Sequence, residues 1–206
     1  MPRPPQCSAE EQLAALLQQR HQHPAQAAAI DAEIRDRFLQ TRAVVILDTV
    51  GFSSKTQGQG IIATLQEIYQ MRAIVVPLMA KHSGTILKLE ADNVYAKFDT
   101  PDGALAAAIE VLQHLNAANL HASLGIGYGD MLAIGEHDLY GDEMNLASKL
   151  GEDIAEDDEI LLTEAAHNFL SGTSWQFDVF TKEVSNLTLT VYQVQQQEAM
   201  IPPMHA

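Results

Sequence analysis

A short apolar run that ends in a carboxylate is the feature that most constrains the fold. Residues 43–47 read Ala-Val-Val-Ile-Leu, and Asp48 follows directly. A continuous run of apolar, mostly β-branched residues predicts a strand that is buried on both faces. A polar residue that closes such a strand lies at the edge of its sheet. We therefore expect the Asp48 carboxylate at the end of this buried strand.

A second carboxylate, Asp92, lies in the turn of a predicted hairpin between the strand-like runs 85–89 and 94–98. If a helical crossover joins strand 43–47 to this hairpin, the hairpin turn returns to the edge where the first strand ends. Asp48 and Asp92 would then be neighbours. Paired carboxylates can hold hard divalent cations that clamp a polyphosphate. Asp is also common in turns for structural reasons, which leaves a purely structural role open.

The hydrophobic pattern predicts an α+β domain with a ferredoxin-like sandwich at its core. A helix from about residue 60 to 82 has a continuous apolar face, and Pro77 should kink it or end it early. Thr100 and a following proline begin a second helix, and a strand covers 120–128. The resulting order of strand, helix, strand, strand, helix and strand is that of a ferredoxin-like sandwich.

Smaller elements are expected after residue 129. In order, they are a strand at 131–134, a loop through Asp138, a helix from about residue 142, a strand at 159–162, a helix at 164–170 and strands at 175–180 and 187–194. We divide the chain into an N-terminal helical extension (1–41), one main domain (42–195) and a loose C-terminal tail (196–206).

Composition limits the partners of the chain. The formal net charge is −15 and the pI is near 4.7, which argues against nucleic acid and anionic membranes, since both need a basic surface. A nucleotide remains possible if metal ions supply the positive charge. Cys7 is the single cysteine, and no stretch approaches the ~20 apolar residues of a membrane span. These properties predict a cytoplasmic protein.

Four segments resemble, in order, the motifs of class III adenylate/guanylate cyclase catalytic domains. Residues 48–53, Asp-Thr-Val-Gly-Phe-Ser, are similar to Asp-Ile-Val-Gly-Phe-Thr of the family, and residues 88–92, Lys-Leu-Glu-Ala-Asp, to Lys-Thr-Ile-Gly-Asp. Residues 125–129, Gly-Ile-Gly-Tyr-Gly, resemble its Gly-Ile-His-Thr-Gly strand. Residues 138–150 resemble the segment that ends in Asn-x-Ala-x-Arg-Leu. The resemblance extends over residues 43–194.

The resemblance implies a site for two Mg²⁺ or Mn²⁺ ions. Asp48 and Asp92 would bind the ions, and the Thr49 carbonyl would be an additional ligand. The amides of Gly51 and Phe52 would face phosphate oxygens.

It also implies residues that bind the nucleotide. Lys88 and Asp138 stand where the family has its purine-selecting lysine and acidic partner, and this pair matches the donor and acceptor pattern of adenine. Asn145 would orient the ribose. Lys149 stands at the position of the transition-state arginine, and lysine keeps the positive charge but loses the planar two-pronged group of arginine.

The activity implied by the resemblance is the conversion of ATP to 3′,5′-cyclic AMP and pyrophosphate in a homodimer with shared sites. Two alternatives remain open. One is a catalytically silent module for nucleotide binding or dimerisation, which Lys149 favours. The other is a cyclase for GTP or a pyrimidine triphosphate.

Overall fold

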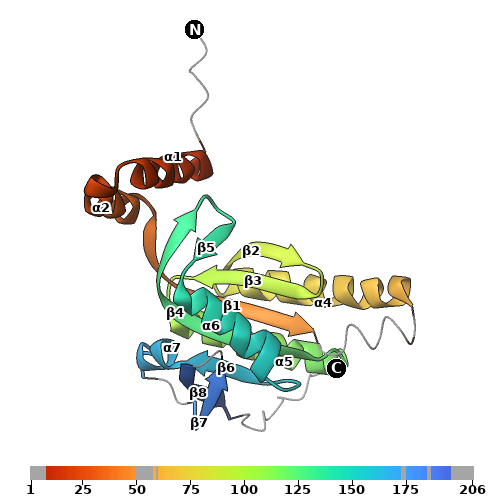
Figure 1. Ribbon diagram of the computed structural model, residues 1–206. Coiled ribbons are helices and arrows are strands. Elements are labelled where there is room, and N and C mark those ends of the chain that lie inside the picture. The colour runs from red at the N-terminus through yellow and green to blue at the C-terminus, as the bar shows by residue number, and fades with distance from the viewer. Residues whose placement is uncertain (1–7, 50–57, 59, 173–174, 185–186, 196–206) are drawn as a thin grey trace.

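The computed structural model describes residues 8–49, 58, 60–172, 175–184 and 187–195 (Figure 1). Gly51 and Phe52, which were expected to face phosphate oxygens, lie outside the described residues.

One mixed sheet organises the described part of the chain. Its strand order is β2-β3-β1-β4-β6-β8-β7, and β5 pairs with β4 outside this path. The strands are β1 (Leu39–Thr49), β2 (Thr85–Glu90), β3 (Asn93–Phe98), β4 (Ala122–Ile134), β5 (Asp138–Tyr140), β6 (Ile160–Thr163), β7 (Phe177–Val184) and β8 (Leu187–Val194). The central strand β1 is antiparallel to both neighbours, β3 and β4.

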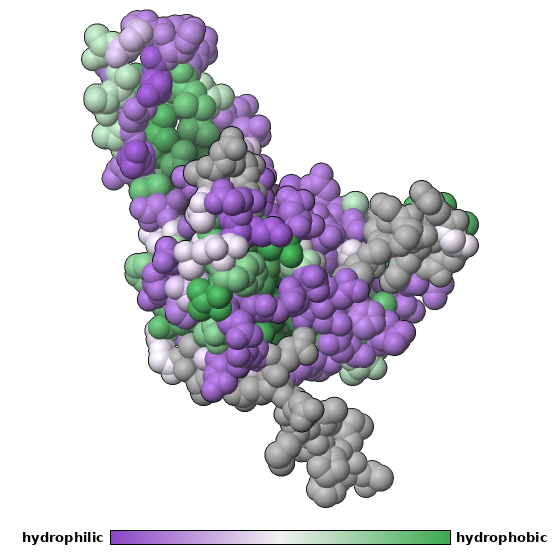
Figure 2. All heavy atoms as spheres, turned by 60° about the horizontal axis from the view of Figure 1, so that its bottom comes forward, coloured by the Kyte–Doolittle hydropathy of each residue, from purple (hydrophilic) through white to green (hydrophobic). Residues whose placement is uncertain are grey.

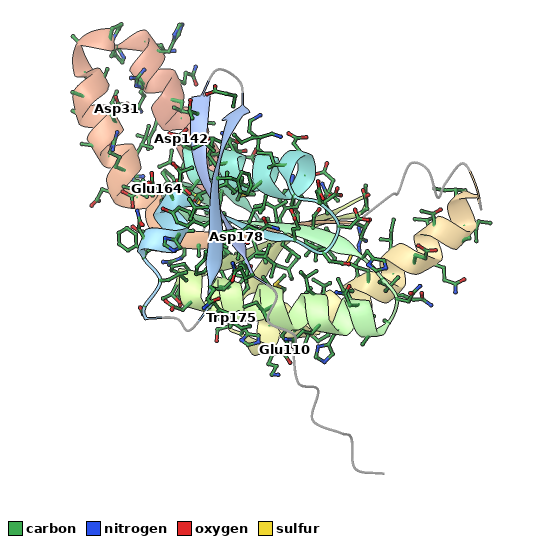
Figure 3. The ribbon with its side chains drawn as sticks, turned by 90° about the horizontal axis from the view of Figure 1, so that it is seen from below. Asp31, Glu110, Asp142, Glu164, Trp175 and Asp178 are labelled. Atoms are coloured by element: carbon green, nitrogen blue, oxygen red, sulfur yellow. The ribbon has the colours of Figure 1, made fainter. Side chains whose placement is uncertain are left out.

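Helices cover both faces of the sheet. They are α1 (Ala9–Gln22), α2 (Ala27–Phe38), α4 (Ile61–Lys81), α5 (Pro101–Ala117), α6 (Asp142–Ser148), α7 (Glu164–Asn168), a 3₁₀ turn η1 (Pro24–Gln26) and a π-helical turn η2 (Lys149–Ile154). Figure 3 shows α5, which carries Glu110, on one side of the sheet, and α6, which begins at Asp142, on the other. The elements β1, α4, β2, β3, α5 and β4 occur in the order predicted for a ferredoxin-like sandwich.

The predicted burial of β1 on both faces is confirmed, because Ala43 to Leu47 are completely inaccessible to solvent. Val45 and Leu47 contribute to the large core that α4 and α5 cover. Val44 and Ile46 face a second cluster on the opposite side, together with Tyr95 of β3. The alternation of side chains along a strand thus divides the apolar run between two cores.

Two expectations for β4 and β5 were wrong. Residues 131–134 are not a separate strand, because Gly129 and Asp130 pair with Arg42 and Thr41 of β1 and carry β4 through to Ile134. Asp138 lies in the short strand β5 and not in a loop, because it pairs with Ile134 of β4. The partners of Gly129 and Asp130 lie about 90 residues earlier in the chain, where a local pattern cannot reveal them, whereas Asp138 pairs only four residues back in a short hairpin that the sequence pattern did not predict.

Pro77 does not end α4, which continues to Lys81. The ring of proline removes the hydrogen bond to the carbonyl four residues earlier, which belongs to Ala73. Pro77 and Ala73 are both exposed, so this carbonyl can bind water instead.

The N-terminal helices α1 and α2 lie at one end of the sheet (Figure 1). A capping box begins α1: the Ser8 hydroxyl accepts from the backbone N–H of Glu11, and the Glu11 carboxylate accepts from the backbone N–H of Ser8. Ile30, Ile34 and Phe38 of α2 pack with Ile134 at the end of β4. On the face drawn in Figure 2, hydrophobic side chains gather on this helical pair, while hydrophilic residues cover much of the sheet domain. Within the described residues, the helices are too short or too polar to cross a membrane.

A stripe of glycines on β4 lets α6 and η2 approach the sheet closely. A Cβ atom added to Gly125 would stand 2.0 Å from the carbonyl oxygen of Ala147 and 2.6 Å from the amide nitrogen of Gly151. On the same stripe, a Cβ atom at Gly129 would meet only the flexible Glu143 side chain, with its Cγ at 2.9 Å. The Gly-x-Gly-x-Gly motif therefore serves helix–sheet packing.

Gly125→Ala should destabilise the fold by about 3 kcal/mol or more, because backbone atoms of α6 and η2 would have to move. Gly129→Ala is the comparison variant and should cost less, about 1–2 kcal/mol, because only the Glu143 side chain must move, with some loss of the hydrogen bonds that its carboxylate accepts from Tyr128 and Thr163. Urea unfolding followed by circular dichroism measures both changes. Equal losses of stability would contradict close backbone packing at Gly125.

Candidate active site

Asp48 and Asp92 meet at one edge of the sheet. Leu47 of β1 pairs with Val94 of β3, which brings the end of β1 beside the β2–β3 turn that holds Asp92. The Thr49 hydroxyl donates a hydrogen bond to Oδ2 of Asp92 at 3.2 Å. The proximity predicted for the two carboxylates is confirmed.

This edge concentrates negative charge. Burial, together with the charges of Asp92, Glu152 and Asp153, raises the pKa of Asp48 from its ordinary value of 3.8 to about 6. A hydrogen bond from the Thr49 backbone opposes the shift only in part. A positive charge bound next to Asp48 would therefore stabilise its ionised carboxylate.

The oxygen atoms at this edge are suited to divalent cations that also bind oxygen atoms of a ligand. Carboxylate and carbonyl oxygens are the ligands that Mg²⁺ prefers, and Mg²⁺ is usually bound through one or two carboxylates plus substrate phosphates. Asp48 and Asp92 supply such carboxylates. Among the described side chains, no group of three or more His, Cys, Asp or Glu residues is arranged to enclose a metal ion. Water and phosphate oxygens are the ligands that usually complete such a coordination.

Lys88 lies on β2 with its ammonium group held by two neighbours. Its Nζ atom donates to Oε2 of Glu90 at 2.7 Å and lies 4.3 Å from the ring centroid of Tyr95. The hydrogen bond to Glu90 raises the pKa of Lys88, and the charge of Asp138 adds a smaller effect in the same direction. The structure thus brings Lys88 and Asp138 within electrostatic range, although the ion pair of Lys88 is with Glu90.

Asn145 and Lys149 occupy consecutive turns of one helical segment. The backbone N–H of Lys149 donates to the carbonyl of Asn145, so the predicted i, i+4 relation is present across the junction of α6 and η2. Lys149 itself begins the π-helical turn, which the sequence pattern did not predict. Glu143 and Ala147 of α6 contact β4, and Asn145, two residues from each, is exposed on the other side of the helix.

Comparison with solved structures finds the same architecture in nucleotide cyclases. A protein from Silicibacter pomeroyi described as an adenylate/guanylate cyclase/hydrolase superposes with a TM-score of 0.69 and 24% identity over 77% of this chain and 98% of its own. The catalytic core of a rhodopsin-guanylyl cyclase with converted specificity, in complex with ATPαS, gives a TM-score of 0.68 and 14% identity over 76% and 98% of the two chains. The adenylyl cyclase CyaB from P. aeruginosa gives 0.64 and 19% over 77% and 96%.

The chain has the class III nucleotide cyclase fold.

A sequence relative also carries the name of a cyclase. A Rhizobium meliloti protein, provisionally named adenylate cyclase 3, is 24% identical over 160 residues, which are 73% of this chain and 27% of that protein. The chain thus spans about a quarter of the length of this relative. No model of a known protein family matches the chain.

Three further residues that were not predicted from the sequence lie at the candidate site. Glu152 and Asp153 belong to η2 and add to the negative charge around Asp48. Tyr95 of β3 donates from its hydroxyl to Oε1 of Glu152 at 3.0 Å. The sequence shows two adjacent acidic residues, Glu152 and Asp153, shortly after the segment 138–150, and this pair could have marked them as candidate site residues. The irregular turn that brings them to the end of β1 could not be recognised from the sequence.

Asp48→Asn should stabilise the metal-free protein at pH 7.5 and abolish thermal stabilisation by Mn²⁺. The folded pKa lies above the unfolded pKa, so the ionised carboxylate costs stability above pH 6 and the protonated form removes this cost below pH 4. With allowance for solvent screening, the cost is on the order of 1 kcal/mol, or a few degrees in Tm.

Differential scanning fluorimetry between pH 4 and 8 measures the effect. The advantage of Asp48→Asn over wild type should shrink as the pH falls through 6. Asp157→Asn, in an exposed turn, is the control and should show no such trend. A lower Tm for Asp48→Asn at pH 7.5 would contradict the proposed charge repulsion.

Proposed function

We propose that this chain is a nucleotide cyclase domain that converts ATP to 3′,5′-cyclic AMP and pyrophosphate. The observation that carries the proposal is the meeting of Asp48 and Asp92 at one sheet edge, in a fold shared with solved adenylyl and guanylyl cyclases. In this reaction the ribose 3′-oxygen attacks the α-phosphorus, the bond from that phosphorus to the β-phosphate oxygen breaks, and the hydroxyl proton passes to solvent.

The carboxylates of Asp48 and Asp92 bind the metal ions, with the Thr49 carbonyl as a further ligand. Two Mg²⁺ or Mn²⁺ ions, when bound, lower the pKa of the 3′-hydroxyl and neutralise the triphosphate. By the family resemblance, the amides of Gly51 and Phe52 would face phosphate oxygens.

Lys88 and Asp138 select the base. The lysine ammonium donates to adenine N1, and the Asp138 carboxylate accepts from the exocyclic amine. Guanine presents the opposite pattern at this edge, with a donor at N1 and an acceptor at O6, so the pair disfavours GTP. Asp138 acts on Lys88 only weakly, and the proposed assignment requires the Lys88 ammonium to leave Glu90 when the base binds.

Asn145 orients the ribose, and Lys149 places a positive charge near the reacting phosphate. Lysine cannot hold two phosphate oxygens in one plane as arginine does, so turnover should be slower than with arginine at this position. This substitution is also what favours the second candidate function, a silent nucleotide-binding module.

The active form is a homodimer whose sites combine residues of both chains. Asp48 and Asp92 lie at the sheet edge, whereas Asn145 is exposed on the side of α6 that faces away from its own sheet. A second copy that covers this side would receive Asn145 and Lys149 in its own metal site. Two equivalent sites would then form across the interface.

Purified protein with Mn²⁺ should convert ATP to cyclic AMP, and GTP more slowly, as measured by mass spectrometry of the products. Asp92→Ala should lower turnover at least ~100-fold, because a metal ligand is lost at the reacting phosphate. Asp99→Ala, on the exposed strand end after β3, is the control and should retain activity. A wild-type protein that binds ATP and makes no cyclic nucleotide with any triphosphate would establish the silent module instead.

Mixing Asp92→Ala chains with Asn145→Ala chains should restore part of the activity. Each mutant homodimer lacks one required residue at both sites, whereas the mixed dimer has one intact site of two. Up to half the wild-type turnover per mixed dimer is expected. Activity that stays at the level of the separate mutants, once native mass spectrometry has shown mixed dimers, would contradict shared sites.

A further inference from the structure

Tyr95 connects two charged side chains of the candidate site. It lies in the middle of β3, with only 8% of its surface exposed, in the cluster that also holds Val44 and Ile46 of β1. The Lys88 ammonium lies over its ring at 4.3 Å, and its hydroxyl bonds Glu152 at 3.0 Å. A buried tyrosine with a cation on its ring face and a carboxylate at its hydroxyl fixes both charged groups.

A β-bulge in β2 brings Lys88 to the ring. Ile86 pairs with Ala96, and the next paired residue of β2 is Lys88, which stands opposite Tyr95. A regular register would place Leu87 opposite Tyr95 and turn Lys88 to the other face of the sheet. Leu87 is the extra residue of the bulge and is buried in the same cluster. The bulge therefore directs the Lys88 side chain to the face that carries the ring of Tyr95.

The hydroxyl of Tyr95 holds Glu152 from the other direction. Gly151, the preceding residue of η2, is fixed by a hydrogen bond of 2.7 Å from the Ser123 hydroxyl to its carbonyl. Ser123 is paired with Asp48 across the β1–β4 ladder. Glu152 is thus held at the Asp48 edge by its backbone and by Tyr95, and its charge acts on Asp48. Asn93 also contacts the hydroxyl, at 3.4 Å.

We infer that Tyr95 is a positioning residue for both halves of the nucleotide site. Its ring face, together with the Glu90 carboxylate, sets the place of the Lys88 ammonium, and hence the discrimination between adenine and guanine. Its hydroxyl sets the place of the Glu152 carboxylate, and hence the negative potential that attracts the metal ions. This inference rests on the proposed function for the identity of the ligand, and its two parts separate chemically. Tyr95→Phe removes only the hydroxyl, whereas Tyr95→Leu removes the ring as well.

The test measures binding of 3′-deoxy-ATP and 3′-deoxy-GTP with Mn²⁺ by isothermal titration calorimetry. Neither analogue can cyclise, because each lacks the attacking hydroxyl, so the measurement does not depend on turnover. Tyr95→Leu should reduce the preference for the adenine analogue by about 10-fold, the size of a desolvated cation–π contact. Tyr95→Phe should keep this preference and raise the Mn²⁺ concentration needed for half-maximal binding about 3-fold.

A double-mutant cycle distinguishes positioning from general destabilisation. Lys88→Ala should lose the preference by itself, and adding Tyr95→Leu to it should cause no further loss. If Tyr95→Leu does not fold, as judged by circular dichroism, Tyr95→Met replaces it in the test, because methionine also lacks a ring and its flexible side chain can fill the space that the tyrosine leaves. A preference that survives Tyr95→Leu, or an equal additional loss in the Lys88→Ala background, would overturn the inference.

The outcomes also separate this inference from the proposed function. A wild type that binds the analogues with adenine preference but does not cyclise ATP refutes the proposed activity and still tests Tyr95. A wild type that cyclises ATP and GTP equally well refutes the role of Tyr95 in base selection. A wild type that binds neither analogue refutes both.

Discussion

The close contact of α6 and η2 with β4 is the constraint on which the candidate site depends. Because Gly125 has no side chain, the backbone around Ala147 and Gly151 rests directly on the strand. Helices ordinarily rest on sheets through a layer of side chains, so this contact shortens the distance between the helical segment and the sheet. It is this shortening that allows the Glu152 carboxylate to reach the hydroxyl of Tyr95, which is buried on the next strand but one.

The negative charge around Asp48 lowers the stability of the fold. The apolar interior of β1 stabilises the sheet, and the same burial raises the pKa of the Asp48 carboxyl group that ends the strand. Three further carboxylates add to this cost. A site that binds a polyphosphate through cations needs negative charge of its own, because the cations must be held by the protein as well as by the polyphosphate. The local loss of stability is therefore consistent with a functional edge, as strained or repulsive arrangements often are.

The sequence allowed the central strand, its flanking helices, the β2–β3 hairpin and the meeting of Asp48 with Asp92 to be predicted. These features follow from local hydrophobic pattern and from the rules of chain connection. The continuation of β4, the strand at Asp138, the bulge before Lys88 and the π-helical turn could not be predicted. The continuation of β4 depends on pairing with β1, about 90 residues earlier in the chain. The strand at Asp138, the bulge and the π-helical turn are short, local departures from a regular hydrogen-bond pattern, which hydrophobic periodicity does not reveal. The Tyr95–Glu152 contact depends on the π-helical turn, and the contact of Lys88 with Tyr95 depends on the bulge.

The π-helical turn makes the length of residues 149–154 more important than their composition. A π turn takes up about one residue more than an α turn, and each α-helical residue advances the side-chain direction by about 100°. Deletion of a single residue from this turn would restore an α-helical hydrogen-bond pattern and shift the remaining residues of the turn by one position along the helix. Glu152 would leave its place beside Tyr95, while Asn145 of α6, which precedes the irregularity, would keep its place. A chain with a regular helix here should therefore align with this one through Ser148 and need a one-residue gap within residues 149–154.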